Sequence, residues 1–314
     1  MTRPDPPLHH AAACPMHPIR TLMTGVLDYA GLFPPARLDM SMTVRNYAGY
    51  RAGPDSWMLG RLIVPCAQLG EFLAEFRAGG PAPEIERAGQ PWRLSVLTAA
   101  AGDPALPGHL EAIDNFNALH GEHARVDSIE LKADSPDAID GALEVIPSDI
   151  TPAFELPWSR DPRGLIAALA GSDAVAKVRT GGLTADLFPP PDALARFILA
   201  CAAARVPFKA TAGLHHPFRH PSRGVTGARE HGFVNVFLGA ALAHHDAIDP
   251  DALTRLLDDE EPSHFRLDDH GLAWSGHRLT SPQIAEARKT FALSYGSCSF
   301  VEPLDDLRGL RWIG

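Results

Sequence analysis

Long apolar runs, an excess of positive charge and clustered cysteines are all missing from this chain of 314 residues. No stretch approaches the roughly eighteen continuous apolar residues of a membrane-spanning helix, which argues against a membrane partner. The formal net charge of −10 argues against nucleic acid, whose phosphates attract basic surfaces. The four cysteines lie far apart and form no C-x-x-C pair, so neither a disulfide framework nor a thiolate zinc cluster is indicated. Small molecules remain as the expected partners.

Lysine is scarce as well. Of the 28 basic residues only Lys132, Lys177, Lys209 and Lys289 are lysines. Arginine keeps its proton at working pH, whereas a lysine can be made neutral and nucleophilic by burial or by a neighbouring cation. A lysine in such an arginine-rich chain is therefore expected to serve a specific role that arginine cannot.

Short apolar segments rich in β-branched residues alternate with helical patterns along most of the chain. The predicted strands are Met23–Leu27, Leu59–Val64, Leu94–Leu97, Ser128–Leu131, Ile150–Glu155, Val175–Arg179, Val206–Thr211 and Gly232–Leu238. The predicted helices are Gln68–Arg77, His109–His120, Pro136–Val145, Pro162–Leu169, Pro191–Ala204 and Ala240–Leu257. Such alternation is typical of a parallel sheet covered by helices.

Eight strand–helix units predict an α/β fold of the (β/α)8 TIM-barrel type, which takes about 250 residues. We assign residues 1–260 to the barrel, with residues 1–20 as an irregular segment before it. Residues 261–314 are predicted to form a C-terminal extension, a hairpin at 265–274 and a helix at 281–291, packed on the barrel. An open doubly wound sheet is the alternative, but no G-x-G-x-x-G or phosphate-binding loop motif supports a nucleotide fold.

Active sites of such barrels lie at the carboxyl ends of the strands, so polar residues expected there are candidates for the site. They are Asp28 on the first strand, Glu130 and Lys132 on the fourth, Glu155 on the fifth, Lys177, Arg179 and Thr180 on the sixth, Lys209, Thr211, His215 and His216 on the seventh, and Asn235 on the eighth. Three of the four lysines fall in this set, which is the strongest signal in the sequence.

The lysines of the sixth and seventh strands are expected to share one chemistry. Because side chains alternate along a strand, Lys177 and Lys209 are predicted to lie on matching faces of neighbouring strands. A pair of ammonium groups lowers the pKa of one of them, which would make Lys177 an amine nucleophile for a carbonyl. Glu130 or Glu155 would move protons, and Asp28 would orient a lysine or a substrate hydroxyl. A structural ion network among these residues is the alternative.

Other residues near the strand ends suggest substrate contacts. Arg179 with Thr180-Gly181-Gly182 predicts an anion site built from a guanidinium and loop N–H groups, or simply a tight turn. Thr211, His216, Asn235 and Lys132 are further candidates for substrate binding. His215 is a candidate general acid or base. A metal ion held by His215, His216 and His231 with carboxylates stays open, although no H-x-H or H-E-x-x-H pattern is present.

The segments K-x-x-T-G-G at Lys177–Gly182 and K-A-x-x-G at Lys209–Gly213 resemble the class I aldolase superfamily, most closely deoxyribose-phosphate aldolase. The resemblance implies that Lys177 forms the imine and that Lys209 tunes it. It extends to Leu27-Asp28, to Cys66 and to an acidic residue on the fourth strand, Glu130 here and Asp in the family. The family's eighth strand ends in a Gly-Ser-Ser phosphate clamp, which the segment from Asn235 lacks, so a phosphorylated substrate is not required.

Three functions therefore stay open. The first is an aldolase-like lyase that acts on a small, anionic carbonyl compound through a lysine Schiff base and needs no cofactor. The second is a metal-dependent barrel hydrolase or isomerase, and the third is a non-catalytic barrel that binds a small anion. The segment from Met1 to Pro18 carries no basic-then-apolar leader pattern, which predicts a cytoplasmic protein. A homo-oligomer is also open, because barrels often associate.

Overall fold

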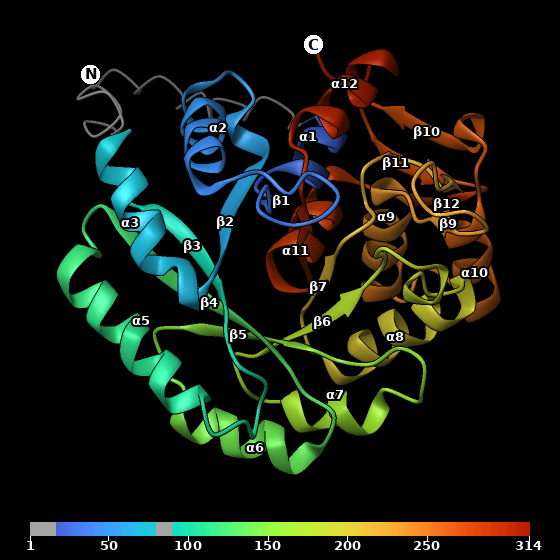
Figure 1. Ribbon diagram of the computed structural model, residues 1–314. Coiled ribbons are helices and arrows are strands. Elements are labelled where there is room, and N and C mark those ends of the chain that lie inside the picture. Colours follow the sequence, from blue (N-terminus) through green and yellow to red (C-terminus); the bar gives the residue numbers. More distant parts are fainter. Residues whose placement is uncertain (1–16, 80–89) are drawn as a thin grey trace, which may run out of the picture.

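Eight parallel strands close into a barrel in the computed structural model, which describes residues 17–79 and 90–314 (Figure 1). The barrel strands are β1 (Leu27–Tyr29), β2 (Leu59–Pro65), β3 (Trp92–Leu97), β4 (Ala124–Lys132), β5 (Thr151–Glu155), β6 (Val175–Arg179), β7 (Phe208–Thr211) and β13 (Ala292–Ser297). Their order around the barrel is β1-β13-β7-β6-β5-β4-β3-β2. The predicted (β/α)8 barrel is confirmed.

Helices surround the strands, as Figure 1 shows most clearly for the ring from α3 to α8. The helices are α1 (Pro18–Met23), α2 (Met40–Ala52), α3 (Leu69–Ala78), α5 (Leu106–His120), α6 (Pro136–Val145), α7 (Arg163–Leu169), α8 (Pro191–Ala204), α9 (Phe233–His244), α10 (Pro250–Asp258), α11 (Ser281–Thr290) and α12 (Val301–Gly309). Short 3-10 turns lie at Ser56–Met58, Cys66–Gln68, Ala185–Leu187 and Pro262–His264. Side-chain caps fix several starts: Asp39, Ser135 and Asp249 each accept a backbone N–H of the first turn.

Most predicted elements lie within a few residues of the observed ones, but some differ. The predicted first strand, Met23–Leu27, lies too early, because α1 ends at Met23 and β1 begins at Leu27. The predicted helix Ala240–Leu257 is in fact two helices, α9 and α10, with a turn between them. Residues 1–20 were expected to be irregular; residues 1–16 lie outside the described residues, and α1 already begins at Pro18.

The predicted eighth strand, Gly232–Leu238, is wrong, because this segment forms the start of α9. Every residue from Phe233 to Ala243 is buried, since α9 packs against α8, α10, α11 and the strand β13. A helix that is buried all round shows a continuous apolar run without a helical period, and such a run has the same pattern as a buried strand. Asn235 therefore does not stand at a strand end.

The eighth strand is β13, which comes from the segment assigned to a C-terminal extension. The predicted hairpin is present as a three-stranded antiparallel sheet of β10 (Phe265–Asp268), β11 (Gly271–Trp274) and β12 (His277–Leu279), and the predicted helix is α11. The chain then returns to the barrel, where β13 pairs with β7 on one side and β1 on the other. The proposed boundary at residue 260 therefore cuts through the barrel.

This topology predicts that a chain ending at residue 260 does not fold. Without β13, β7 and β1 have unpaired edges, and the buried face of α9 loses its cover. We expect no cooperative thermal transition by circular dichroism, whereas the full chain melts cooperatively. A truncated chain that melts within a few degrees of the full chain would show that the barrel closes without β13.

Among the described residues, the stretch Ala185–Ala204 is long and apolar enough to span a membrane by length and composition alone. Most of this stretch is α8, whose Leu194, Phe197, Ile198 and Cys201 are buried in the core. Core helices of folded domains pass the same test, so this stretch is weak evidence for a membrane span.

Candidate functional site

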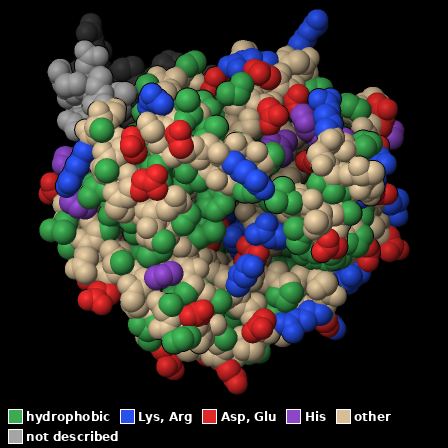
Figure 2. Space-filling model, viewed as in Figure 1, with side chains coloured by type: hydrophobic (Ala, Val, Ile, Leu, Met, Phe, Trp, Pro, Cys, Tyr) green, Lys and Arg blue, Asp and Glu red, His purple; other side chains and the backbone are tan. Residues whose placement is uncertain are grey.

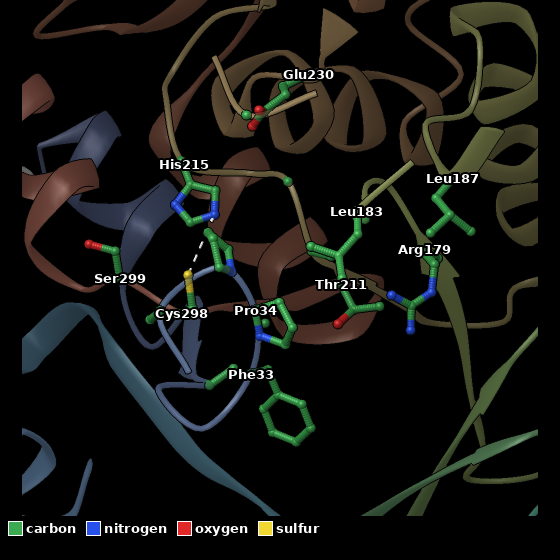
Figure 3. A pocket seen from close by; sticks show the side chains of 18 of the residues that line it. Phe33, Pro34, Arg179, Leu183, Leu187, Thr211, His215, Glu230, Cys298 and Ser299 are labelled. Atoms are coloured by element: carbon green, nitrogen blue, oxygen red, sulfur yellow. Dashed lines mark hydrogen bonds between the residues drawn. The ribbon is translucent and has the colours of Figure 1, made fainter. Parts of the chain in front are cut away.

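A cavity of about 860 Å³ opens where the barrel strands end. Its wall comes from the loops after β1, β6, β7 and β13, represented by Phe33, Leu183, His215 and Ser299 (Figure 3). Glu130 and Lys177 also line it, from the inside of the barrel. Figure 2 shows basic and acidic side chains together near the centre of the face seen in Figure 1, bordered by hydrophobic ones. The cavity thus occupies the position expected for a barrel active site.

Lys177 lies at the inner wall of this cavity. Its side chain is 4% exposed, and its Nζ lies 2.6 Å from Oε2 of Glu130 and 2.8 Å from Oε2 of Glu155. These three residues come from neighbouring strands, and Glu155 stands beside Lys177 in the β5–β6 register. The alternation of side chains on β4, β5 and β6 therefore brings them together as predicted.

Lys209 lies in the same cluster but does not line the cavity. Its Nζ donates hydrogen bonds to Oδ2 of Asp28 and to Oε1 of Glu130, both at 2.7 Å. It is the register partner of Lys177 on the neighbouring strand, as the sequence predicted. The carboxylate of Glu130 pairs with both lysines. Glu130 lines the cavity, and Lys209 lies behind it.

Hydroxyl and backbone groups complete the buried cluster. Ser95 on β3 donates to Oε1 of Glu130, and Ser294 on β13 donates to Oδ2 of Asp28, both at 2.8 Å. The backbone N–H of Arg61 donates to Oδ1 of Asp28 at 2.8 Å. Sequence reasoning missed Ser95, which the alternation along its strand could have identified, and Ser294, whose strand was placed elsewhere.

The formal charges in the cluster balance. Lys177, Lys209 and Arg179 carry three positive charges, and Asp28, Glu130 and Glu155 carry three negative ones. Burial alone would raise the pKa of each of these carboxyl groups, but the adjacent cations outweigh it, so the pKa values of all three lie below their ordinary values. The three carboxyl groups are therefore ionised in the resting state.

The expected lowering of the Lys177 pKa by Lys209 stays a prediction, whereas the pKa of Lys209 itself is shifted. Burial lowers the pKa of Lys209, but the carboxylates of Asp28 and Glu130 raise it by more, and the result lies above the ordinary value. The carboxylates stand between the two ammonium groups, and for this reason like-charge repulsion does not dominate. The raised pKa favours the protonated form of Lys209, and of the two lysines only Lys177 lines the cavity.

The lowered carboxyl pKa values predict acid-sensitive folding. A carboxyl group whose pKa is lower in the folded state contributes stability that is present above its unfolded pKa and is lost as the pH falls below it. We expect the free energy of unfolding, from urea denaturation, to fall steeply between about pH 5 and pH 3. Glu130→Gln should flatten this slope, whereas Glu111→Gln, at an exposed position on α5, should leave it unchanged. Equal slopes in all three proteins would contradict the ionised network.

Arg179 lies beside the lysine cluster at the cavity wall. Its Nε lies 3.1 Å from Oε1 of Glu155, and about a third of its side chain is exposed. The next residue, Thr180, is buried and donates its hydroxyl to backbone oxygens of Thr211 and Ala212, so it holds two loops together. It does not face the cavity, and a substrate contact by its side chain is not supported.

The two glycines after Thr180 have different surroundings. A Cβ on Gly181 would lie 2.9 Å from the Cα of Gly213, so only glycine permits the close approach of the loops after β6 and β7. Gly182 lines the cavity. Thr211 and Arg179 line it as well (Figure 3). Of the predicted anion site, Arg179 and Gly182 line the cavity, whereas Thr180 and Gly181 shape the loops. Thr211, a separate candidate for substrate binding, also lines the cavity.

His215 and His216 both line the cavity, and each has its own carboxylate partner. Nδ1 of His215 lies 2.9 Å from Oε2 of Glu302, and Nδ1 of His216 lies 2.6 Å from Oδ2 of Asp306. Burial lowers the pKa of His215, but the contacts with Cys298 and Glu302 raise it by more, to about 9. Sequence reasoning missed Cys298, Ser299 and Glu302, because they follow a strand that was placed elsewhere.

The remaining predicted residues do not meet at the cavity. Asn235 is buried in α9, where its amide donates to backbone oxygens of Leu256 and Asp259 and accepts from the N–H of Arg219, so its predicted substrate contact is wrong. Lys132 is exposed at the end of β4 and does not line the cavity. Its predicted role in substrate binding therefore gains no support.

In the part of the chain that the structure describes, His231 does not share contacts with the other proposed metal ligands, His215 and His216. It is buried, and its Nε2 lies 2.8 Å from the carbonyl oxygen of Pro189. Burial and, to a lesser extent, the nearby Arg219 cation lower the pKa of His231 to about 4. Within residues 17–79 and 90–314, no group of three or more His, Cys, Asp or Glu side chains is arranged to hold a metal ion. Metal dependence stays a prediction, which metal analysis of the untagged protein would test.

The corrected eighth strand changes one more inference. The segment after β13 reads Gly296-Ser297-Cys298-Ser299, and Gly296, Cys298 and Ser299 line the cavity. The lack of hydroxyls near Asn235 therefore says nothing about the ligand, because that segment is not the strand end. Comparison of the chain with models of protein families and with curated proteins found no match.

Proposed function

We propose that this barrel is a lyase of the class I aldolase type, which acts on a small carbonyl compound through a Schiff base on Lys177. The observation that carries the proposal is the position of Lys177: a buried ammonium group that reaches the cavity and contacts two carboxylates that can take its proton. The other three lysines lack this combination. Lys209 is behind Glu130 and does not line the cavity, and Lys132 and Lys289 are exposed.

Imine formation needs two proton transfers, and the carboxylates beside Lys177 can serve both. The ammonium group of Lys177 first gives a proton to Glu155 or Glu130, at 2.8 and 2.6 Å. The neutral amine then adds to the carbonyl carbon, and the carbinolamine loses water when the carboxylic acid returns its proton to the leaving hydroxyl. The resulting imine accepts the electron pair released when a carbon–carbon bond breaks.

Arg179 links substrate binding to this proton transfer. In the resting structure its guanidinium pairs with Glu155, and this contact helps to keep the pKa of Glu155 low. An anionic substituent that binds Arg179 would weaken that pair and increase the proton affinity of Glu155. The substrate would thereby improve the base that deprotonates Lys177.

Arg179→Met tests this link. We expect it to weaken binding of an anionic carbonyl compound about tenfold to a hundredfold, which corresponds to a charge-assisted hydrogen bond of about 1.5–3 kcal/mol. A neutral analogue with the same carbonyl group should bind the variant and the parent protein equally. Binding would be measured by calorimetry, and an equal loss for both compounds would contradict an anion contact at Arg179.

Borohydride trapping tests the proposed function directly. The protein is incubated with a panel of small aldehydes, ketones and keto acids, reduced with borohydride, and analysed by intact mass and peptide mapping. We expect at least one compound to add its reduced mass at Lys177 and not at Lys132 or Lys289, which serve as internal controls. No adduct at Lys177 with any compound of the panel would overturn the proposal.

A non-catalytic barrel that binds a small anion is the second candidate. The observation that favours it is the complete pairing of both lysines, which is also what a structural ion network requires. In that case Lys177→Arg would leave ligand binding intact, whereas Arg179→Met would abolish it. The aldolase-type function predicts that Lys177→Arg removes turnover while the anion still binds.

A further inference from the structure

A cysteine, a histidine and a glutamate contact one another in series on the cavity wall. The cysteine and the histidine, Cys298 and His215, lie on a different side of the cavity from Arg179 (Figure 3). The Sγ of Cys298 lies 3.8 Å from Nε2 of His215, and Nδ1 of the same imidazole lies 2.9 Å from Oε2 of Glu302. All three residues line the cavity. Neither the Schiff-base steps nor the buried lysine cluster uses them.

Three separate elements of the fold position these three residues. His215 lies in the loop after β7, Cys298 follows β13 directly, and Glu302 lies in the first turn of α12. The hydroxyl of Ser299 accepts the backbone N–H of Glu302, which fixes the start of α12 against the loop that carries the cysteine. Cys298 is 8% exposed, so a small reagent in the cavity can reach its sulfur.

A histidine cation lies beside the sulfur of Cys298. His215, with its raised pKa of about 9, is a cation at neutral pH, and Glu302 holds that cation with its Nε2 toward the sulfur. On the side of β1, burial raises the pKa of Tyr29 to about 12, so that phenol stays neutral. His216, next to His215, pairs with Asp306. A cation beside a thiol is the arrangement that makes cysteines nucleophilic.

The other described cysteines lack this arrangement. Burial raises the pKa of the Cys66 thiol, whose Sγ contacts the carbonyl oxygen of His109. Cys201 is fully buried in α8, and burial raises its pKa further. Both therefore serve as internal controls for the reactivity of Cys298, whereas Cys14 lies outside the described residues.

We propose that Cys298 is a nucleophilic thiol that exchanges with small disulfides entering the cavity. The thiolate of Cys298, paired with the protonated imidazole of His215, attacks one sulfur of the disulfide, and a new S–S bond forms as the old one breaks. The leaving thiolate then takes the proton from His215, so the disulfide is reduced by one thiol and no other oxidant is needed. Glu302 is the positioning residue, because it acts through the imidazole.

The bound mixed disulfide would fill part of the cavity that Lys177 shares, and it would block access of a carbonyl compound. This regulatory consequence rests on the proposed function, whereas the exchange reaction itself does not. The reactivity of Cys298 can thus be established even if Lys177 forms no imine.

The first experiment measures exchange with 2-hydroxyethyl disulfide, a small neutral reagent, on the full chain. Samples are quenched over time between pH 6 and pH 9, and each cysteine is followed by peptide mapping. We expect Cys298 to react at least about tenfold faster than Cys66 at pH 7. Equal rates for the two, or a Cys298 that stays unmodified, would overturn the proposal.

Variants then separate activation from mere exposure. His215→Gln and Glu302→Gln should each slow the reaction of Cys298 about tenfold at pH 7 and shift its pH profile toward that of an ordinary thiol, near pH 8.5. Cys66→Ser is the matched control and should leave the rate unchanged. Circular dichroism checks that each variant is folded, and the exposed position of Glu302 provides a second variant if His215→Gln unfolds. Rates like those of the parent protein in both folded variants would refute the activation.

Blocking of the cavity is measured on the same samples. Protein carrying the mixed disulfide should lose borohydride trapping at Lys177, and reduction with excess thiol should restore it. Trapping that is unchanged by the modification would overturn the regulatory consequence. An absence of trapping in the unmodified protein would instead count against the proposed function and leave the exchange rates as the test of Cys298.

Discussion

Lys177→Arg should abolish the borohydride adduct while the protein stays folded. Arginine keeps a cation between Glu130 and Glu155, so the buried charge balance is preserved. Its guanidinium does not lose its proton and cannot form an imine. With a compound that the parent protein traps, we expect turnover to fall by about 10²–10⁴-fold or more, the range contributed by groups that take part in the chemistry.

Lys132→Arg is the matched control, because Lys132 is exposed and lies outside the cavity. It should keep the adduct and the turnover of the parent protein. Turnover that survives in Lys177→Arg would assign the chemistry to other residues, and the melting temperature of both variants would be recorded to exclude unfolding.

Lys209→Met should cause the largest loss of stability of any lysine substitution. It leaves Asp28 and one oxygen of Glu130 in the buried cluster without their cation, and removing one partner of a buried ion pair costs about 3–5 kcal/mol. Lys132→Met, at an exposed position, should change the free energy of unfolding by no more than about 0.5 kcal/mol. Both values would be measured by urea denaturation.

A double variant tests the ion pair between Lys209 and Asp28 most directly. Asp28→Asn added to Lys209→Met removes one of the two uncompensated carboxylates, so the double variant should be more stable than Lys209→Met alone. If the two substitutions simply add their separate losses, the ion pair between Lys209 and Asp28 does not contribute as described.

The barrel and the lysine pair could be predicted from the sequence because they depend on local patterns. Regular strand–helix spacing predicts the barrel, and the alternation of side chains predicts that Lys177 and Lys209 share a register position. The sequence does not show how deeply each side chain is buried in the barrel. Which lysine reaches the cavity depends on how the carboxylate of Glu130 lies between the two ammonium groups, and that follows only from the closed barrel.

The eighth strand shows a second limit. The segment from Phe233 to Ala243 is buried on all sides, so its apolar run could not distinguish a helix from a strand. The segment Ala292–Ser297, which does form the eighth strand, follows a hairpin and a helix that break the strand–helix rhythm. This one error displaced Asn235 into the site and kept Cys298, Ser299 and Glu302 out of it.

The most direct test of the role of Lys177 is a crystal structure of the borohydride-reduced complex with a trapped anionic carbonyl compound. We expect continuous density from Nζ of Lys177 to the former carbonyl carbon, the anionic group on Arg179, and Lys209 still between Asp28 and Glu130. Density for the adduct on any other lysine, or an intact Lys177 ion pair beside an occupied cavity, would contradict this role of Lys177.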